Sequence, residues 1–192
     1  MPNERHGRSS SLGAVPTLVL DPQPAEIKEL VARRRALGID RWDEVWEGVL
    51  HMIPPPSHKH QVIASRLHRI LGPLADEAGL ELTGEVGIGS DEHDYRAADL
   101  ALHRPGDVEP QWHHTAAMVV EIVSPNDKTW DKLDFYAAHH VDELLIVDPE
   151  LRAIHWLELT KGEYRPLASS GLIKLSPSEL AARMDWPERP AD

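Results

Sequence analysis

The spacing of hydrophobic and polar positions predicts helices and strands in a mixed order. Apolar residues at helical intervals predict one helix over residues 24–37 and a longer one from Ser57 to about Ala78, with Ser57 as its N-cap. A further helix is expected from Lys128 and a small terminal one from Ser176. Apolar or alternating runs predict strands over residues 42–53, 80–89, 96–103, 118–123, 143–148 and 153–159, and a short strand after a hairpin turn at 161–164. This order favours the α+β class, as a mixed sheet flanked by helices in an α/β/α-like arrangement.

The same pattern shows no internal repeat and no break between domains. We expect a single domain over residues 15–192, with its core at about 42–160, and a flexible, Ser-rich tail over residues 1–14. The apolar segment from Val15 to Leu20 is expected to form an edge strand or a contact with a partner subunit.

Composition narrows the class of protein. The chain has no Cys, which excludes a disulfide framework and thiolate zinc sites. Its apolar runs are too short to span a bilayer and its first 13 residues lack the apolar core of a signal peptide, so we expect a cytoplasmic protein with no membrane partner. The formal net charge of −12 disfavours non-specific nucleic-acid binding but leaves room for a divalent ion that bridges acids to phosphate. We interpret the Arg33–Arg35 run as a solvated helix face.

Two acids stand inside apolar segments that predict central strands. Glu121 lies in the middle of the run 118–123, and Asp99 lies among small and aliphatic residues in the run 96–103. A carboxylate in a buried strand costs several kcal/mol unless a cation or hydrogen-bond donors meet it. With Lys132 on the following helix, the two acids predict a hard-metal site that has a cationic neighbour. The alternative is that backbone N–H groups satisfy both acids and Lys132 faces solvent.

Glu44 and Glu47 compete for a third acidic position. Alternation along a regular strand puts them on opposite faces, so only one points inward. Glu47 adjoins Gly48, where a bend would redirect it. The choice between the two glutamates stays open at this point.

Two further side chains are candidates for the same site. His60 stands at the start of the long helix, where it would orient an acid or contact phosphate. A zinc site built from His60 and neighbouring histidines is disfavoured, because their spacing matches no familiar zinc motif. Tyr136 lies one turn after Lys132 on the same helical face and either contacts the site or packs in the core.

Several local motifs occur in an order and spacing that resembles a known family. They are Glu-Val-Trp-Glu-Gly-Val-Leu (44–50), Pro-Ser-His-Lys-His (56–60), Ala-Asp-Leu (98–100), Val-Glu-Ile-Val-Ser-Pro (120–125), Lys-Leu-Asp-Phe-Tyr (132–136) and Val-Asp-Glu-Leu-Leu-Ile-Val-Asp (141–148). Over about residues 43–148 the chain resembles the Uma-type restriction endonuclease family of the PD-(D/E)XK nuclease superfamily. Two positions depart from the pattern: Ala98 replaces a proline, and Val123 stands where the superfamily has its lysine. Lys132 matches the position from which this family takes its lysine.

The resemblance implies a restriction-endonuclease-like fold. It also implies an endonuclease that hydrolyses nucleic acid with Mg²⁺ or Mn²⁺, with DNA as the first expected substrate. The implied site residues are Asp99 and Glu121 as metal ligands, Lys132 beside the attacking water, and His60 and Tyr136 nearby. Of the two candidates for the third acid, the resemblance favours Glu44 over Glu47 as a metal ligand, because Glu44 matches the family's strand glutamate. The alternative is a catalytically inactive module that keeps the nuclease fold and acts through protein contacts as a homodimer. The net charge and the displaced lysine favour this alternative.

Overall fold

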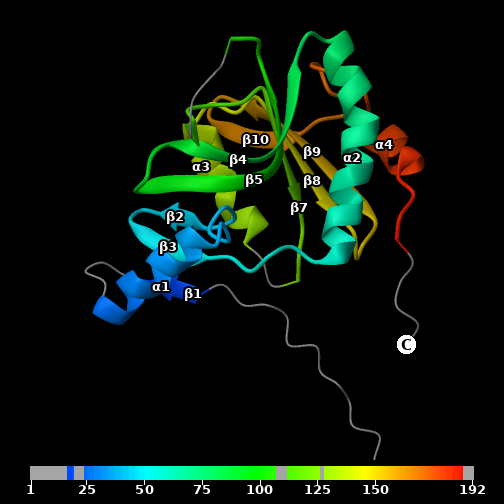
Figure 1. Ribbon diagram of the computed structural model, residues 1–192. Helices are drawn as coiled ribbons and strands as arrows, with labels where there is room; N and C mark the ends of the chain where they lie inside the picture. Colours follow the sequence, from blue (N-terminus) through cyan, green and yellow to red (C-terminus); the bar gives the residue numbers. More distant parts are fainter. Residues whose placement is uncertain (1–16, 20–23, 107–111, 126–127, 188–192) are drawn as a thin grey trace, which may run out of the picture.

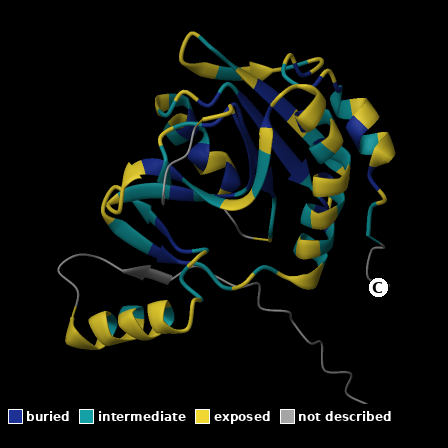
Figure 2. Cartoon of the chain, turned by 45° about the horizontal axis from the view of Figure 1, so that its top comes forward, coloured by how far each residue is buried: buried dark blue, intermediate teal, exposed yellow. Residues whose placement is uncertain are grey.

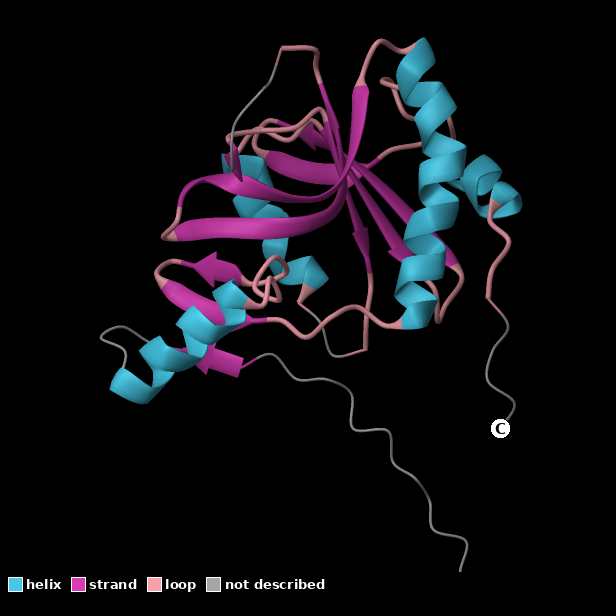
Figure 3. Cartoon of the chain, viewed as in Figure 1, coloured by secondary structure: helices cyan, strands magenta, loops and turns pink. Residues whose placement is uncertain are grey.

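The computed structural model describes residues 17–19, 24–106, 112–125 and 128–187, and of residues 17–19 it describes the backbone alone. Within these ranges ten strands form one sheet, with four α-helices and a 3₁₀ helix around it (Figures 1 and 3). The strands are β1 (Thr17–Val19), β2 (Glu44–Trp46), β3 (Val49–Met52), β4 (Glu81–Asp91), β5 (Asp94–His103), β6 (Trp112–His113), β7 (Met118–Ile122), β8 (Glu143–Asp148), β9 (Ala153–Thr160) and β10 (Glu163–Pro166). The helices are α1 (Ala25–Ala36), α2 (His58–Glu77), η1 (Thr129–Lys132), α3 (Leu133–Ala138) and α4 (Pro177–Arg183). The predicted α+β class is confirmed.

The sheet is mixed, and β5 and β7 lie at its centre. Its strands follow the order β1-β3-β2-β5-β7-β8-β9-β10, and β4 pairs with β5 and β6. Strand β7 runs parallel to β8, and the chain crosses between them through η1 and α3. Strand β5 is antiparallel to β7 from Leu100 to Leu102, while at Tyr95 it pairs with β2. The strands that carry Asp99 and Glu121 are therefore neighbours.

Helices cover both faces of the sheet (Figure 1). Val120 of β7 belongs to the apolar cluster that includes Leu67 of α2. Val119, the next residue along β7, belongs to a second cluster with Tyr136 of α3. Because side chains alternate along a strand, Glu121 also points to the α3 face.

Helix α2 begins and ends where the sequence predicts. Ser57 is its N-cap, and the Ser57 Oγ accepts a hydrogen bond from the backbone N–H of His60 at 3.2 Å. The helix continues through Pro73 to its C-cap Ala78. Four apolar residues bury its inner face: Ile63, Leu67, Leu71 and Ala75. The cap and this face together fix the position of His60 at the helix start.

Three predicted elements differ from the structure in detail. The strand predicted over residues 42–53 is a hairpin of β2 and β3, because Glu47 and Gly48 form a turn with φ values of 50° and 82°. Tight hairpin turns of this kind need positive φ at both central residues. The strands predicted over residues 80–89 and 96–103 extend further towards each other, because β4 continues to Asp91 and β5 starts at Asp94. The helix predicted from Lys128 starts as η1 and continues as α3.

Helix α1 forms as predicted, but it is poorly packed. None of its residues is buried (Figure 2), and Leu30 and the C-cap residue Leu37 are 42% and 62% exposed. Within the Arg33–Arg35 run, the flanking arginines are exposed as predicted. Arg34 instead donates two hydrogen bonds to the Asp43 carboxylate, at 2.5 and 3.0 Å. An ion pair therefore links α1 to the residue that precedes the hairpin.

The predicted tail over residues 1–14 lies outside the described residues. Within the predicted segment 15–20, residues Thr17–Val19 form β1, which pairs antiparallel with β3 at the edge of the sheet. Among the described residues, no helix is both long and apolar enough to cross a membrane.

Candidate active site

A buried ion-pair cluster lies between β7, the β2–β3 hairpin and the η1–α3 segment. Lys132 Nζ is 3.0 and 3.2 Å from the two carboxylate oxygens of Glu121, and 2.7 Å from Glu44 Oε1. One turn further along, the Tyr136 hydroxyl donates a hydrogen bond to Glu121 Oε1. Glu44, Glu121 and Lys132 are only 4%, 5% and 8% exposed. Lys132 therefore meets carboxylates and not solvent, as the metal-site interpretation requires.

The two glutamates of the hairpin lie in different surroundings. Glu44 points inward, where its Oε1 accepts from the backbone N–H of Ala97 at 3.1 Å and its Oε2 accepts from the Trp46 indole at 2.7 Å. Glu47 is exposed in the turn, and its backbone N–H donates to Asp94 Oδ1. Glu44 is thus the hairpin acid that reaches the cluster.

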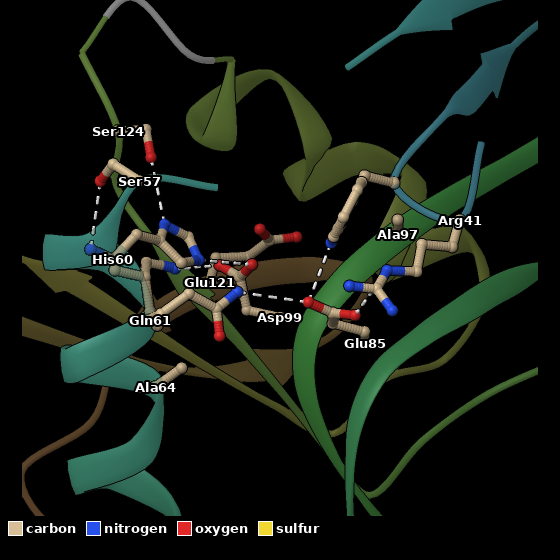
Figure 4. A network of polar contacts seen from close by, with 12 residues as sticks. Arg41, Ser57, His60, Gln61, Ala64, Glu85, Ala97, Asp99, Glu121 and Ser124 are labelled. Atoms are coloured by element: carbon tan, nitrogen blue, oxygen red, sulfur yellow. Dashed lines mark hydrogen bonds and ion pairs between the residues drawn. The ribbon is translucent and has the colours of Figure 1, made fainter. Parts of the chain in front are cut away.

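Asp99 is held from two sides next to this cluster (Figure 4). His60 Nε2 is 2.9 Å from Asp99 Oδ1, and the backbone N–H of Ile122 donates to Asp99 Oδ2 at 2.7 Å. The other ring nitrogen of His60, Nδ1, is 3.2 Å from Ser124 Oγ, so the imidazole lies between Ser124 and Asp99. The Asp99 side chain remains 23% exposed. Its orientation is therefore fixed by α2 and β7 while it stays accessible.

Burial and neighbouring charges shift the titration of the cluster. Burial raises the pKa of Glu121 to about 7; the Lys132 charge opposes this shift, and the Asp99 and Glu44 carboxylates add to it. Burial acts to lower the pKa of Lys132, but the Glu121 and Glu44 carboxylates outweigh it and hold that pKa above its usual range. Burial, followed by the Glu121 charge, raises the pKa of Tyr136 well above its usual value. Lys132 thus stays charged and Tyr136 stays a donor, so Glu121 is the group that titrates near neutral pH.

The chemistry of these groups fits a hard divalent cation. Mg²⁺ and Mn²⁺ prefer carboxylate oxygens, and three carboxylates here face one ammonium group. A divalent ion would offset this excess of negative charge. Among the residues described, however, no three His, Cys, Asp or Glu side chains converge closely enough to hold an ion alone. Glu44 and Glu121 both contact Lys132, and with Asp99 they do not form the expected three-acid set. Water or substrate oxygens would complete a shell around Asp99 and Glu121.

The cluster lines a cavity of about 500 Å³, which we call the alcove. Its walls come from the β2–β3 hairpin, the Pro54–Pro56 segment, the start of α2, the end of β7 and the turn after β8. Besides Asp99, Glu121, Glu44 and Lys132, its lining includes Trp42, Trp46, Lys59 and Lys128. Cavities of this size hold small organic ligands or parts of larger ones.

A family model supports the resemblance drawn from the motifs. The model of the Uma2 family, described as "Putative restriction endonuclease", matches residues 39–186. The chain belongs to the Uma2 family. The matched range contains every site residue predicted from the sequence.

A solved structure shares the fold of this Uma2 chain. The crystal structure of a putative nuclease belonging to DUF820 from Anabaena variabilis, at 1.96 Å resolution, matches with a TM-score of 0.59 and 14% identity, over 73% of this chain and 90% of that one. A smaller likeness is found to the DrdV–DNA complex, with a TM-score of 0.36 and 16% identity, over 56% of this chain and 10% of that one. Another is to the type IIG restriction endonuclease BpuSI, with a TM-score of 0.39 and 14% identity, over 65% of this chain and 15% of that one. No curated protein matches the sequence. The restriction-endonuclease-like fold expected from the sequence is confirmed.

The structure adds residues to the Uma2 site that the sequence prediction does not include. Ser124 follows the strand that carries Glu121 and contacts His60. It stands in the motif 120–125, but the motif alone does not indicate this contact. Glu85 of β4 lies opposite Asp99 with a positive φ of 36° and also lines the alcove. An acid inside a predicted strand is the signal that singles out Asp99 and Glu121, and it applies equally to Glu85. Trp42 gives no such signal, because only the folded chain places it beside the acids.

Proposed function

We propose that the chain is a Mg²⁺- or Mn²⁺-dependent endonuclease that hydrolyses phosphodiester bonds in nucleic acid, with DNA as the first candidate. The observation that carries this proposal is the Lys132 ammonium group, buried between Glu44 and Glu121 and lining one cavity with Asp99. Buried charges of this kind add little to stability, and often reduce it compared with apolar residues. Catalysis accounts for their presence in a fold that nucleases share.

Asp99 and Glu121 are the residues that would hold the ion. A bound divalent ion supplies positive charge to a phosphate oxygen and lowers the pKa of a coordinated water. His60 and the Ile122 N–H position Asp99, because each binds one oxygen of its carboxylate. Asp99 thus keeps a fixed geometry without the ion, which reduces the entropy lost when the ion binds.

Lys132 is the residue that acts on the reacting phosphate or on the attacking water. During hydrolysis a bond forms between the water oxygen and phosphorus while one ester P–O bond breaks, and charge spreads over the phosphate oxygens. An ammonium group close to these oxygens stabilises that charge. Glu44 keeps Lys132 in place, and Tyr136 keeps Glu121 in place, through their contacts with the pair. The same contacts keep Lys132 protonated.

A cleavage assay tests the proposal. We expect the wild type to cut at least one member of a panel of single-stranded, duplex and flapped DNA and RNA in Mn²⁺ or Mg²⁺, and to cut nothing in EDTA. Asp99→Asn should reduce the rate at least 100-fold, since it removes a charged ligand. Asp134→Asn, an exposed acid on α3, is the matched control and should keep wild-type activity. Equal rates for the wild type and Asp99→Asn, or no cleavage of any substrate, would overturn the assignment.

A second candidate function is a nuclease-fold module that acts through protein contacts as a homodimer. It is favoured by α1, which exposes Leu30 and buries none of its own residues, and by β1, which lies at the edge of the sheet. Exposed apolar residues next to an edge strand are typical of interfaces. Sedimentation should then show a dimer that Leu30→Asp dissociates. A wild-type monomer at micromolar concentration would rule this candidate out.

A further inference from the structure

The alcove has the shape and the walls of a site for one unpaired nucleotide. Its volume of about 500 Å³ lies within the range of pockets that enclose small organic ligands. Two indoles, Trp42 and Trp46, and the Pro54–Pro56 segment contribute apolar surface to the lining of this cavity. Flat apolar walls of this kind bind nucleobases by stacking, whatever the base, because every base presents a π-face. A base that is stacked and paired inside a duplex cannot enter such a pocket.

Trp42 is the indole that the structure leaves available for stacking. The Trp46 ring already has the His51 ring at 4.7 Å and the Arg96 guanidinium at 4.4 Å from its centre. Trp42 has only Arg41 over its ring, at 4.1 Å, among the ring contacts of the described residues. The Trp42 indole N–H donates to Glu85 Oε1 at 2.8 Å, so the ring is held in a fixed orientation before any ligand binds.

A second hollow adjoins the alcove at Asp99, His60 and Glu85. This groove has a volume of about 580 Å³, and it runs over α2 and β4, lined by Arg41, Gln61, Ser65 and His68. Asp99, His60 and Glu85 line both the groove and the alcove. Figure 4 shows Gln61 and Glu85 beside Asp99, and Arg41 against Glu85. A strand could thus place one base in the alcove, its phosphate at Asp99 and the next sugar-phosphate units along the polar groove.

The charges around the alcove are unfavourable for a duplex. Five carboxylates and three lysines line the cavity, and two of these lysines are engaged with acids, Lys132 with Glu121 and Lys59 with Glu150. Duplex binding depends on many Lys and Arg contacts to phosphates, which this surface and the net charge of −12 do not provide. Stacking of a base on an aromatic ring adds about 1–3 kcal/mol per base through the π-face of the base and not through its phosphate.

From these observations we propose that the substrate enters as unpaired nucleic acid, a single strand, a flap or an overhang, with one base stacked on Trp42 in the alcove. This inference rests on the proposed nuclease function, whose site it shares. It adds a substrate class and assigns Trp42 as a specificity-determining residue that touches the base and not the reacting phosphate.

Binding measurements test the inference separately from catalysis. Fluorescence anisotropy is measured in Mn²⁺ with a cleavage-resistant phosphorothioate 12-mer, as a single strand and as a blunt duplex. We expect the single strand to bind at least tenfold more tightly. Trp42→Ala should weaken single-strand binding about tenfold, whereas Trp42→Phe, which keeps an aromatic face, should weaken it about twofold. Trp130→Ala is the matched control, because Trp130 is 49% exposed and does not line the alcove.

An abasic 12-mer provides a test that needs no protein variant. It keeps the phosphates and removes the bases, so we expect its affinity for the wild type to be at least tenfold lower. Equal binding of the abasic strand, tighter binding of the duplex, or no effect of Trp42→Ala would overturn the inference. If any of these results came together with cleavage of the duplex, the inference would fail and the nuclease function would stand. Selective single-strand binding with no cleavage in any metal would instead refute the nuclease function alone.

Discussion

The two faces of the central sheet are built from different chemistry. On the α2 face, Leu67 and Val120 are buried in a continuous apolar cluster. The α3 face has an apolar cluster of its own, but there Glu121 and Lys132 are also buried, beside Tyr136. Apolar burial contributes about 25 cal/mol per Å² to stability, whereas a buried ion pair at best breaks even against apolar residues. The comparison indicates that both faces contribute apolar packing to the fold, and that the α3 face also holds a buried charged cluster, which the proposed function explains.

The largest expected effect comes from breaking the ion pair on the α3 face. Lys132→Ala leaves two buried carboxylates without their cation and should lower the free energy of unfolding by about 4 kcal/mol in urea denaturation. Lys128→Ala, an exposed lysine close by, serves as the control and should change it little. A loss below about 1 kcal/mol for Lys132→Ala would mean that backbone donors satisfy the acids, and the contrast between the faces would be lost.

The apolar cluster of the α2 face should respond in stability alone. Leu67→Ala removes a side chain with no exposed surface and should lower the free energy of unfolding by about 3 kcal/mol, through lost burial and the cavity left behind. Its Mn²⁺ affinity, measured under folding conditions, should equal that of the wild type. Leu30→Ala on the exposed helix α1 should change stability by less than about 0.5 kcal/mol. A loss of metal binding in folded Leu67→Ala would show that the two faces are not separate in role.

The pH dependence of stability should separate the faces further. The pKa of Glu121 is about 7 in the folded chain, above its usual value of 4.5, so the folded state binds more protons between these pH values than the unfolded state. The free energy of unfolding should therefore fall, through this group, as pH rises from 4.5 to 7. Glu121→Gln should lose this contribution, and Leu67→Ala should keep the wild-type slope. Urea denaturation across this range measures it; identical slopes for wild type and Glu121→Gln would contradict the prediction.

The smallest effect is expected at the helix start that carries His60. Ser57→Ala removes the N-cap of α2 and should lower the free energy of unfolding by about 1 kcal/mol. Ser65→Ala, on the exposed side of the same helix, should change it little. Because His60 holds Asp99, Ser57→Ala should also weaken Mn²⁺ binding slightly. Unchanged stability of this variant would show that the Ser57 cap does not stabilise α2.

The sequence predicts the helices and strands of this fold better than it predicts the contacts between them. Helix α2 and strand β7 follow from local apolar patterns, and so do the central positions of Asp99 and Glu121. The choice of Glu44 over Glu47 depends on a turn with positive φ, and its contact with Lys132 depends on where β2 lies in the sheet. Contacts between residues far apart in the sequence follow from strand order, which local periodicity does not encode.

The central claim is that Asp99 and Glu121 hold a divalent ion beside Lys132. Calorimetric titration of Mn²⁺ into the wild type, Asp99→Asn and the exposed control Asp134→Asn tests it most directly, because it needs no substrate. The account predicts binding to the wild type and to Asp134→Asn, and none to Asp99→Asn at the same concentrations. No uptake by the wild type at millimolar Mn²⁺, or equal uptake by Asp99→Asn, would contradict it.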